Sequence, residues 1–420
     1  MSSNPEKASA PAGRSSHMAE HIVIFSPLPP RKSGIASYTA ELLPFFCERA
    51  RVTVVCEEGG TEAIYEALGF RAPGLEIITP AEHEARDELH ALPTFHQIGN
   101  NKDHVFVYDA FMRRPGVLVQ HDFNLHYLVD DVTLARGDQD GYRHVLAEEY
   151  GDAGATLADM RHIGMFSEAQ KLALPLNQHL LHRARAVIVH SHWVYDRIPA
   201  ALREQVTVLP HHYSPLVATV AGLSQDQARA ELGLPAEGFI FLSLGFITPP
   251  KQIQTTLKAL GTLKRAGHEF HFVIAGERNA GLDIDAHIAA NDLAEDVTVT
   301  GYVGETAFFR YIKAADCLVN LRYPTVGESS GTLARALALG LPAIVHNFGP
   351  SSEFPDHTVI KVPLELGVPN HLTEALRLVM TSPHMRAALG AEAKVHMEQH
   401  ASARQSVASY FDSVAAADAR

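Results

Sequence analysis

Short apolar runs separated by helical stretches recur along the chain in two rounds, the first from residue 21 and the second from residue 239. The runs are continuous rather than alternating, which is typical of parallel strands that helices bury on both faces. The intervening segments have helical spacing: Ile253, Leu257 and Leu260 are four and three residues apart, and Gly267 ends that predicted helix. The predicted strands are HIVIF (21–25), VTVVC (52–56), HVFV (104–107), VLVQ (117–120), AVIVH (186–190), FIFLSL (239–244), FHFVIA (270–275), VTVT (297–300), CLVNL (317–321) and PAIV (342–345).

Alternating strands and helices predict βαβ units, and hence an α/β fold of two Rossmann-like, doubly wound parallel-sheet domains facing each other across a cleft. The length of 420 residues exceeds the roughly 250–300 at which one core stops growing. We expect the first domain to span 21–215 and the second 216–395, since a Pro-, Ser- and Gly-containing stretch separates the two rounds. Residues 396–420 are predicted to form a C-terminal helix that packs back on the first domain. Residues 1–20, rich in Ser, Ala and Pro, are predicted to be a disordered lead-in.

Composition limits the compartments and the classes of partner that we expect for this protein. A net charge of -13 argues against nucleic acid or an anionic membrane as the main partner. No apolar run approaches the ~18 residues that span a bilayer. The three cysteines have no metal or redox spacing, which favours free thiols in a reducing compartment. We therefore expect a cytoplasmic protein with at most peripheral contact at the inner face of the membrane.

The stretch Asn320–Gly340 carries the strongest chemical signal. It contains the end of a buried strand, a turn with Glu328, and a helix whose N-cap is Ser329 or Ser330 and whose end is Gly340. The packed face of this helix is predicted to consist of Leu333, Ala336 and Leu337. Free N–H groups at a helix start bind phosphate, and a carboxylate binds sugar hydroxyls. This combination indicates an enzyme that uses a nucleotide sugar.

Cations and glycines near other predicted strand ends suit the same ligand. Lys251 lies six residues after Gly245, at a helix start where cation and N–H groups can neutralise a diphosphate; a solvated lysine is the equal alternative. Arg322 adds a positive charge near the phosphate, or forms a salt bridge with Glu328. Gly34 begins a helix after a Pro-rich loop, where the backbone can approach a phosphate or sugar closely. The alternative for Gly34 is a simple helix-start turn.

Histidines form the last group of candidates. His121 directly follows the strand VLVQ, at the sheet edge where ligands bind, and its imidazole can donate to a sugar hydroxyl or stabilise charge. With 25 histidines in the chain, a purely structural role is the alternative. Asp122 either orients the His121 ring or caps the next segment. Four further histidines are interpreted as loop residues at the cleft edge, with metal ligation less favoured: His190, His192, His211 and His212.

With these segments in order, the chain resembles the family 4 glycosyltransferases, which are retaining enzymes of the GT-B fold. The resemblance covers roughly residues 21–395. Gly34 matches the family's first glycine-containing loop, His121 a histidine that contacts the donor sugar, and Lys251, after Gly245, a lysine that binds the donor diphosphate. Glu328 matches the first glutamate of an E-x7-E motif, which holds the sugar hydroxyls. The helix-start residues that meet the phosphates are Ser329, Ser330, Gly331 and Thr332. Glu353 is a weaker match to a later acidic residue.

Two positions depart from the family pattern. Phe246 stands where the family has a phosphate-binding arginine, and Arg322 is the hypothetical replacement. The second glutamate of the motif, which grips the nucleotide ribose, is also absent. Counting forward from Glu328 places Ala336 at that position, and counting back from the helix end places Arg335 there. The chain is thus a divergent member, and the nucleotide is left open.

The resemblance implies a metal-independent hexosyltransferase without a cofactor, which moves a sugar from a nucleotide-sugar donor, with retention, in polysaccharide or glycoconjugate biosynthesis. The second domain would bind the donor, and the first a glycan or lipid-linked glycan acceptor. The implied catalytic residues are His121, Lys251 and Glu328, and the implied donor-binding residues are Gly34, Gly245, Arg322, Ser329, Ser330, Gly331 and Thr332. Alternatives are a non-catalytic GT-B-like binding subunit and, less favoured, a nucleotide-sugar epimerase or glycan phosphorylase.

Overall fold

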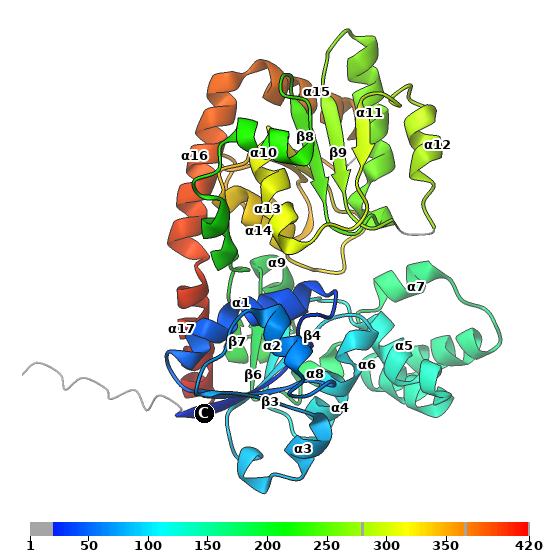
Figure 1. Cartoon of the computed structure of the whole chain (residues 1–420). Coiled ribbons are helices and arrows are strands. Elements are labelled where there is room, and N and C mark those ends of the chain that lie inside the picture. Colours follow the sequence, from blue (N-terminus) through cyan, green and yellow to red (C-terminus); the bar gives the residue numbers. More distant parts are fainter. Residues whose placement is uncertain (1–19, 279–280, 365–367, 419–420) are drawn as a thin grey trace, which may run out of the picture.

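Two parallel β-sheets organise the chain, one above the other in the view of Figure 1, and each is the centre of a domain. The structure is a computed structural model that describes residues 20–278, 281–364 and 368–418. The expected α/β fold of two parallel-sheet domains is confirmed. The predicted lead-in lies outside the described residues, apart from Glu20.

The first sheet has seven parallel strands in the order β3-β2-β1-β4-β5-β6-β7. Ile22 and Ile24 of β1 pack into one apolar cluster, and Val23 and Phe25 pack into another. The sheet is therefore buried on both faces, as continuous apolar runs predict. Its strands are β1 (His21–Phe25), β2 (Arg51–Val55), β3 (Leu75–Ile78), β4 (Thr94–Ile98), β5 (Val117–Gln120), β6 (Ala186–Val189) and β7 (Val206–Val208). The helices of this half are α1 (Gly34–Cys47), α2 (Glu62–Leu68), α3 (Pro80–Glu84), α4 (Val105–Arg113), α5 (His126–Val132), α6 (Gln139–His162), α7 (Glu168–Ala173), α8 (Gln178–Leu181) and α9 (His192–Tyr195).

The second sheet has six parallel strands in the order β10-β9-β8-β11-β12-β13. Strand order reverses beside the first strand of each sheet, and ligands of doubly wound folds bind at such a switch point. The strands are β8 (Ile240–Leu244), β9 (His271–Ala275), β10 (Val297–Val299), β11 (Cys317–Asn320), β12 (Ala343–His346) and β13 (Ile360–Val362). The helices that follow β7 are α10 (Gln225–Leu232), α11 (Ile253–Arg265), α12 (Ile284–Ala289), α13 (Glu305–Ala314), α14 (Gly331–Ala338), α15 (Val368–Thr381), α16 (Pro383–His400) and α17 (Ala403–Asp418).

One predicted strand is wrong, and four strands were not predicted. The run HVFV enters helix α4, whose full sequence VFVYDAFMR repeats its apolar residues with helical spacing. The actual strand is β4, and it was missed because the polar residues His96 and Gln97 interrupt its apolar run. The unpredicted β3, β7 and β13 are only three or four residues long. Their sequences are too short to carry a period.

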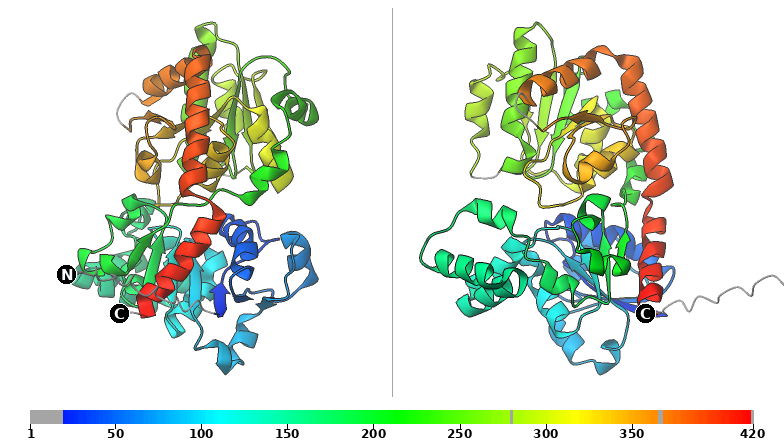
Figure 2. Two further views of the ribbon diagram at one scale, coloured as in Figure 1. Left: turned by 90° about the vertical axis from the view of Figure 1, so that its left-hand side faces the viewer. Right: turned by 180° about the vertical axis from the view of Figure 1, so that it is seen from behind.

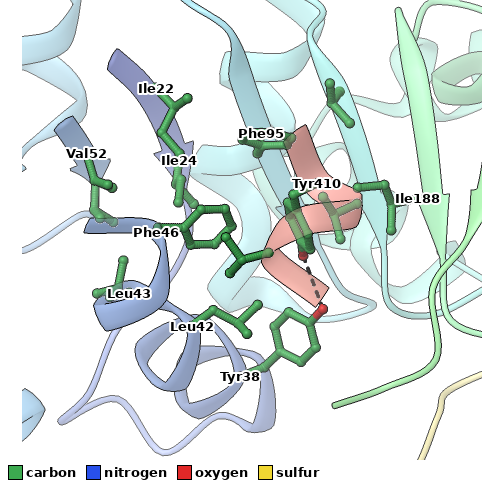
Figure 3. Close-up of a cluster of buried hydrophobic side chains, with 14 of the residues drawn as sticks. Ile22, Ile24, Tyr38, Leu42, Leu43, Phe46, Val52, Phe95, Ile188 and Tyr410 are labelled. Atoms are coloured by element: carbon green, nitrogen blue, oxygen red, sulfur yellow. Dashed lines mark hydrogen bonds between the residues drawn. The ribbon is translucent and has the colours of Figure 1, made fainter. Parts of the chain in front are cut away.

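The last helices connect the two domains. Figures 1 and 2 show α16 lying along the second domain and α17 continuing past the first. Helix α17 packs on α1 and β6, and its Phe411 and Tyr410 belong to the core of the first domain. Figure 3 shows Tyr410 among the apolar side chains of this core. The expected boundary at residue 395 lies inside α16, and the boundary at residue 215 lies between β7 and β8. No helix in the described ranges combines the length and the apolar character needed to cross a bilayer.

Candidate functional site

A cleft of about 1020 Å³ lies between the domains, at the carboxyl ends of the strands of both sheets. The loops after β1, β5 and β6 line one wall, and those after β8 and β11 line the other. All ten predicted site residues line this cleft, and their roles remain predictions: Gly34, His121, Gly245, Lys251, Arg322, Glu328, Ser329, Ser330, Gly331 and Thr332.

The entry to helix α14 holds Glu328 at a fixed position. Ser330 is the N-cap, as expected, and its hydroxyl accepts from Leu333 N–H at 3.2 Å. The Oε2 atom of Glu328 accepts from the Thr325 hydroxyl at 2.7 Å and from Val326 N–H at 3.0 Å. These two bonds anchor one carboxylate oxygen. The side chain is 23% exposed, so the carboxylate is accessible from the cleft.

Two of the predicted cations lie in this wall. Lys251 is 8% exposed, and its ammonium donates to the carbonyl of Leu244. Burial, aided by the charge of Arg322, holds the Lys251 pKa well below its ordinary range. Arg322 Nε lies 3.9 Å from Glu328 Oε1, so the alternative of an Arg322–Glu328 salt bridge is present in the structure. An anionic ligand would favour the charged form of Lys251 and would compete with Glu328 for Arg322.

Gly245 allows the lysine to reach the start of α14. It has φ +87°, and a Cβ there would lie 3.0 Å from Lys251 Nζ and 3.7 Å from Thr332 Oγ1. Lys251 and Thr332 therefore adjoin the same point. Phe246, which replaces the expected arginine, leaves its ring 45% exposed. Gly34, the first residue of α1, has open space at its Cβ position.

Both ring nitrogens of His121 lie within hydrogen-bond distance of a neighbouring side chain. Its Nε2 lies 2.7 Å from the side-chain amide of Gln97, and its Nδ1 lies 3.1 Å from Nε2 of His190. The His190 Nδ1 bonds to the carbonyl of Leu209 at 2.9 Å. Burial and the neighbouring His190 lower the pKa of His121 well below its ordinary value, so the ring is neutral. A sugar hydroxyl would have to displace Gln97 or His190 to bond to this imidazole.

The anchor of His121 extends to the C-terminal helix. The Gln97 amide also bonds to the Tyr410 hydroxyl at 3.2 Å, and Tyr410 bonds to the Tyr38 hydroxyl at 3.2 Å (Figure 3). Tyr38 in turn packs its ring edge against His121, with ring centroids 4.7 Å apart. The sequence does not signal this network, because α17 is far from β4 and β5 along the chain.

Asp122 was expected to orient His121 or to cap the next segment, and it does neither. Its Oδ2 accepts from Asn100 N–H at 2.7 Å, and the carboxyl lines the cleft. Burial, then the charge of Glu328 from the other domain, raise the pKa of Asp122 to about 7. A carboxyl that titrates near neutral pH in a cleft is a functional candidate. Sequence position gave a weak signal, since Asp122 directly follows His121.

Two further residues of this cleft were not assigned roles from the sequence. Arg335 of α14 bonds to Glu41 of α1 at 2.5 Å, and His212 bonds to the other oxygen of Glu41 at 2.8 Å. Arg335, followed by His212, holds the pKa of the buried Glu41 carboxyl at about 2 despite desolvation. The available signal was an arginine at the expected glutamate position. In this chain the residue at that position is positively charged, and it bonds to Glu41 of the first domain.

The remaining candidates have structural partners. Glu353 accepts hydrogen bonds from the N–H groups of His192 and Trp193 at the start of α9, so it joins the domains rather than lining the large cleft. His190 and His211 line the cleft, as interpreted from the sequence. Within the described ranges, no group of three or more metal-ligating side chains is arranged to hold an ion.

Part of the chain matches a known family. Residues 224–396 match the family described as glycosyl transferases group 1, so the second domain contains a glycosyl transferases group 1 domain. The 2-deoxystreptamine glucosyltransferase of Streptomyces kanamyceticus is 26% identical over 182 residues, which are 43% of this chain and 45% of that protein. The match therefore spans less than half the length of this relative.

Solved structures share the fold over nearly the whole chain. Sucrose-phosphate synthase from Thermosynechococcus elongatus has a TM-score of 0.64 at 16% identity, covering 94% of this chain and 98% of its own. HepE from Anabaena, in complex with UDP and glucose, has a TM-score of 0.61 at 16% identity, covering 94% and 100%. WaaG, a glycosyltransferase involved in lipopolysaccharide biosynthesis, has a TM-score of 0.57 at 13% identity, covering 92% and 98%. These likenesses establish the GT-B arrangement of the two domains.

Proposed function

We propose that this chain, whose second domain contains a glycosyl transferases group 1 domain, moves a hexose from a nucleoside-diphosphate sugar to an acceptor hydroxyl with retention of configuration. One observation carries the proposal. The carboxylate of Glu328 lies at the start of α14, in a cleft that both domains line and that also holds Lys251 and Arg322. Carboxylates bind sugar hydroxyls, while cations and helix-start N–H groups bind phosphate.

The same geometry explains how the leaving group would be stabilised. Lys251 and the hydroxyl of Thr332, in the first turn of α14, adjoin Gly245, so a diphosphate placed there would meet the lysine at the start of this helix. Arg322 would add a second cation in place of the arginine that Phe246 replaces. Preorganised charges of this kind stabilise a departing diphosphate, which removes the need for a divalent ion in the proposed mechanism. The opposed domains would exclude water, which otherwise hydrolyses the donor.

The named relatives suggest which ligands to test first. HepE has a structure with UDP and glucose, so a UDP-hexose is the first donor. WaaG acts in lipopolysaccharide biosynthesis, which favours a glycan or lipid-linked glycan acceptor. The Streptomyces relative is a 2-deoxystreptamine glucosyltransferase, so an aminocyclitol is a further acceptor to include.

A ligand screen followed by one substitution tests this function. Thermal unfolding with UDP-, GDP-, ADP- and TDP-sugars should identify one donor that adds about 2.7 kcal/mol at a hundred times its dissociation constant. Replacing Glu328→Ala should then slow donor hydrolysis or transfer by about 10- to 100-fold, the equivalent of lost hydrogen bonds to a charged group. The control is Glu392→Ala, the same change at an exposed residue of α16. Binding without any turnover would instead support a non-catalytic binding subunit, and full activity in Glu328→Ala would contradict the site.

A further inference from the structure

The two domains touch where the loops after β5 and β11 meet. Asn124 N–H donates to the carbonyl of Val326 at 2.8 Å across the domain boundary. Gly327 has φ +88°, and a Cβ there would lie 2.4 Å from the Cβ of Phe123. Only glycine permits this close approach. The contact places Asp122 of the first domain beside Glu328 of the second, on the wall of one cleft.

Each carboxyl is anchored by one oxygen. Asp122 Oδ2 accepts from Asn100 N–H, and Asn100 is itself fixed because its side-chain oxygen accepts from Leu128 N–H at 3.1 Å. Glu328 Oε2 accepts from Thr325 and Val326, while its Oε1 faces Arg322. Among the described residues, Asp122 Oδ1 has no hydrogen-bond donor. One oxygen of each carboxyl is thus available to a ligand in the cleft.

The surroundings of Asp122 raise the pKa of its carboxyl group. Burial and the charge of Glu328 raise the pKa of Asp122, while the Asn100 N–H group and the charge of Arg322 lower it, with a result of about 7. Neighbouring His121 is a poorer proton acceptor, because burial and the charge of His190 hold its pKa well below the ordinary value. Asp122 can therefore exchange a proton near neutral pH while keeping its bond to the Asn100 N–H group.

We propose that Asp122 accepts the proton of the acceptor hydroxyl while Glu328 holds the hydroxyls of the sugar being transferred. This assignment rests on the proposed function. The acceptor oxygen bonds to the anomeric carbon on the face from which the diphosphate departs, as retention requires, and the electron pair of the broken carbon–oxygen bond leaves with the nucleoside diphosphate. The acceptor O–H bond breaks, its proton moves to Asp122, and Asp122 then releases it to solvent. Because Asp122 and Glu328 belong to different domains, this pair exists only when the domains are in contact.

The test is Asp122→Asn, which preserves an oxygen for the Asn100 N–H group. With the donor found in the screen, kcat should fall about 10²- to 10⁴-fold while KM for the donor stays within about threefold. The rise of kcat with pH through about 7 in the wild type should disappear in the variant. The matched control is Asp131→Asn, a nearby acid on α5 that does not line the cleft. Thermal unfolding verifies that each variant is folded.

A second measurement does not depend on turnover. Carbon-13 NMR of the side-chain carboxyl, assigned as the signal lost in Asp122→Asn, should titrate near pH 7 and should move to lower pH in Glu328→Gln, which removes the opposing charge. Titration at the ordinary value of an aspartate would overturn the proposal, as would wild-type kcat and pH profile in Asp122→Asn. A wild-type chain that turns over none of the donors would refute the proposed function itself, and this is apparent before any variant is made.

Discussion

Several histidines of the first domain are buried as neutral rings, and they set how the fold responds to acid. His96 is 1% exposed and stacks on Phe25 with ring centroids 5.1 Å apart. Burial lowers the pKa of His96 to about 3, and that of His104 to about 4. Both values lie below the ordinary 6.5 of the unfolded chain. The unfolded state therefore binds protons first as the pH falls, which favours unfolding.

The pH dependence of stability tests this account of His96. The contribution of a neutral buried ring is complete above pH 6.5 and is lost as the pH falls toward 3. Between pH 7.5 and pH 5, we expect His96→Phe to lose less stability than the wild type, by on the order of 2 kcal/mol. Urea unfolding at the two pH values measures the difference. His384→Gln, at an exposed site on α16, should behave as the wild type, and equal losses in all three proteins would contradict the prediction.

At the scale of elements, helix α17 is part of the core of the first domain and supports the wall of the site from behind. Its Tyr410 lies among the apolar side chains of the first domain (Figure 3), and its hydroxyl bonds to both Tyr38 and Gln97. Gln97 on β4 then bonds to His121 after β5. A helix from the end of the chain thereby fixes the ring that the first domain presents to the cleft.

Removal of the Tyr410 hydroxyl tests how much the hydrogen bonds of this helix contribute to stability. Tyr410→Phe should lower the free energy of unfolding by about 1–3 kcal/mol, because Gln97 and Tyr38 lose a buried partner and no water replaces it. Denaturant unfolding measures the change. The matched control is Tyr302→Phe, at a tyrosine that is 53% exposed, where about 0.5 kcal/mol or less is expected. Equal effects at the two tyrosines would remove Tyr410 from the network.

At the scale of the molecule, a buried ion pair joins the domains. Arg335 and Glu41 are 14% and 5% exposed, and His212 completes the cluster. Lys32 and Glu277 also pair across the cleft, but they are 54% and 48% exposed. Exposed pairs contribute little because water and salt screen them, whereas an unpaired buried charge is costly.

These two pairs predict different responses to the loss of a cation. Arg335→Ala should destabilise the protein by about 3–5 kcal/mol, because Glu41 remains buried with His212 and the Ser214 hydroxyl but without the guanidinium. Lys32→Ala should cost at most about 1 kcal/mol. Denaturant unfolding compares the two, and small-angle scattering should detect separation of the domains in Arg335→Ala alone. A cost at Arg335 as small as that at Lys32 would contradict an energetic role for the buried pair.

The sequence alone was sufficient where local pattern sets the structure. Continuous apolar runs specify buried parallel strands, and Ser330, Leu333 and Gly340 specify the start, face and end of α14, since caps and periodicity act within a few residues. Local patterns and the family resemblance also selected ten candidate site residues, and all ten line the cleft. It failed at β4 and α4, where a four-residue apolar run does not distinguish a strand from a helix.

The tertiary structure alone decided which groups face each other. Arg335 and Glu41 are 294 positions apart, and Gln97 and Tyr410 are 313 apart. Asp122 and Glu328 lie on one cleft because Gly327 packs on Phe123 and Asn124 bonds to Val326 across the domain boundary. Hydrogen-bond partners and pKa values depend on burial and distance between segments, which no local pattern encodes. The sequence therefore determined that a carboxylate stands at the start of α14, and the packing of two domains determined the groups that oppose it.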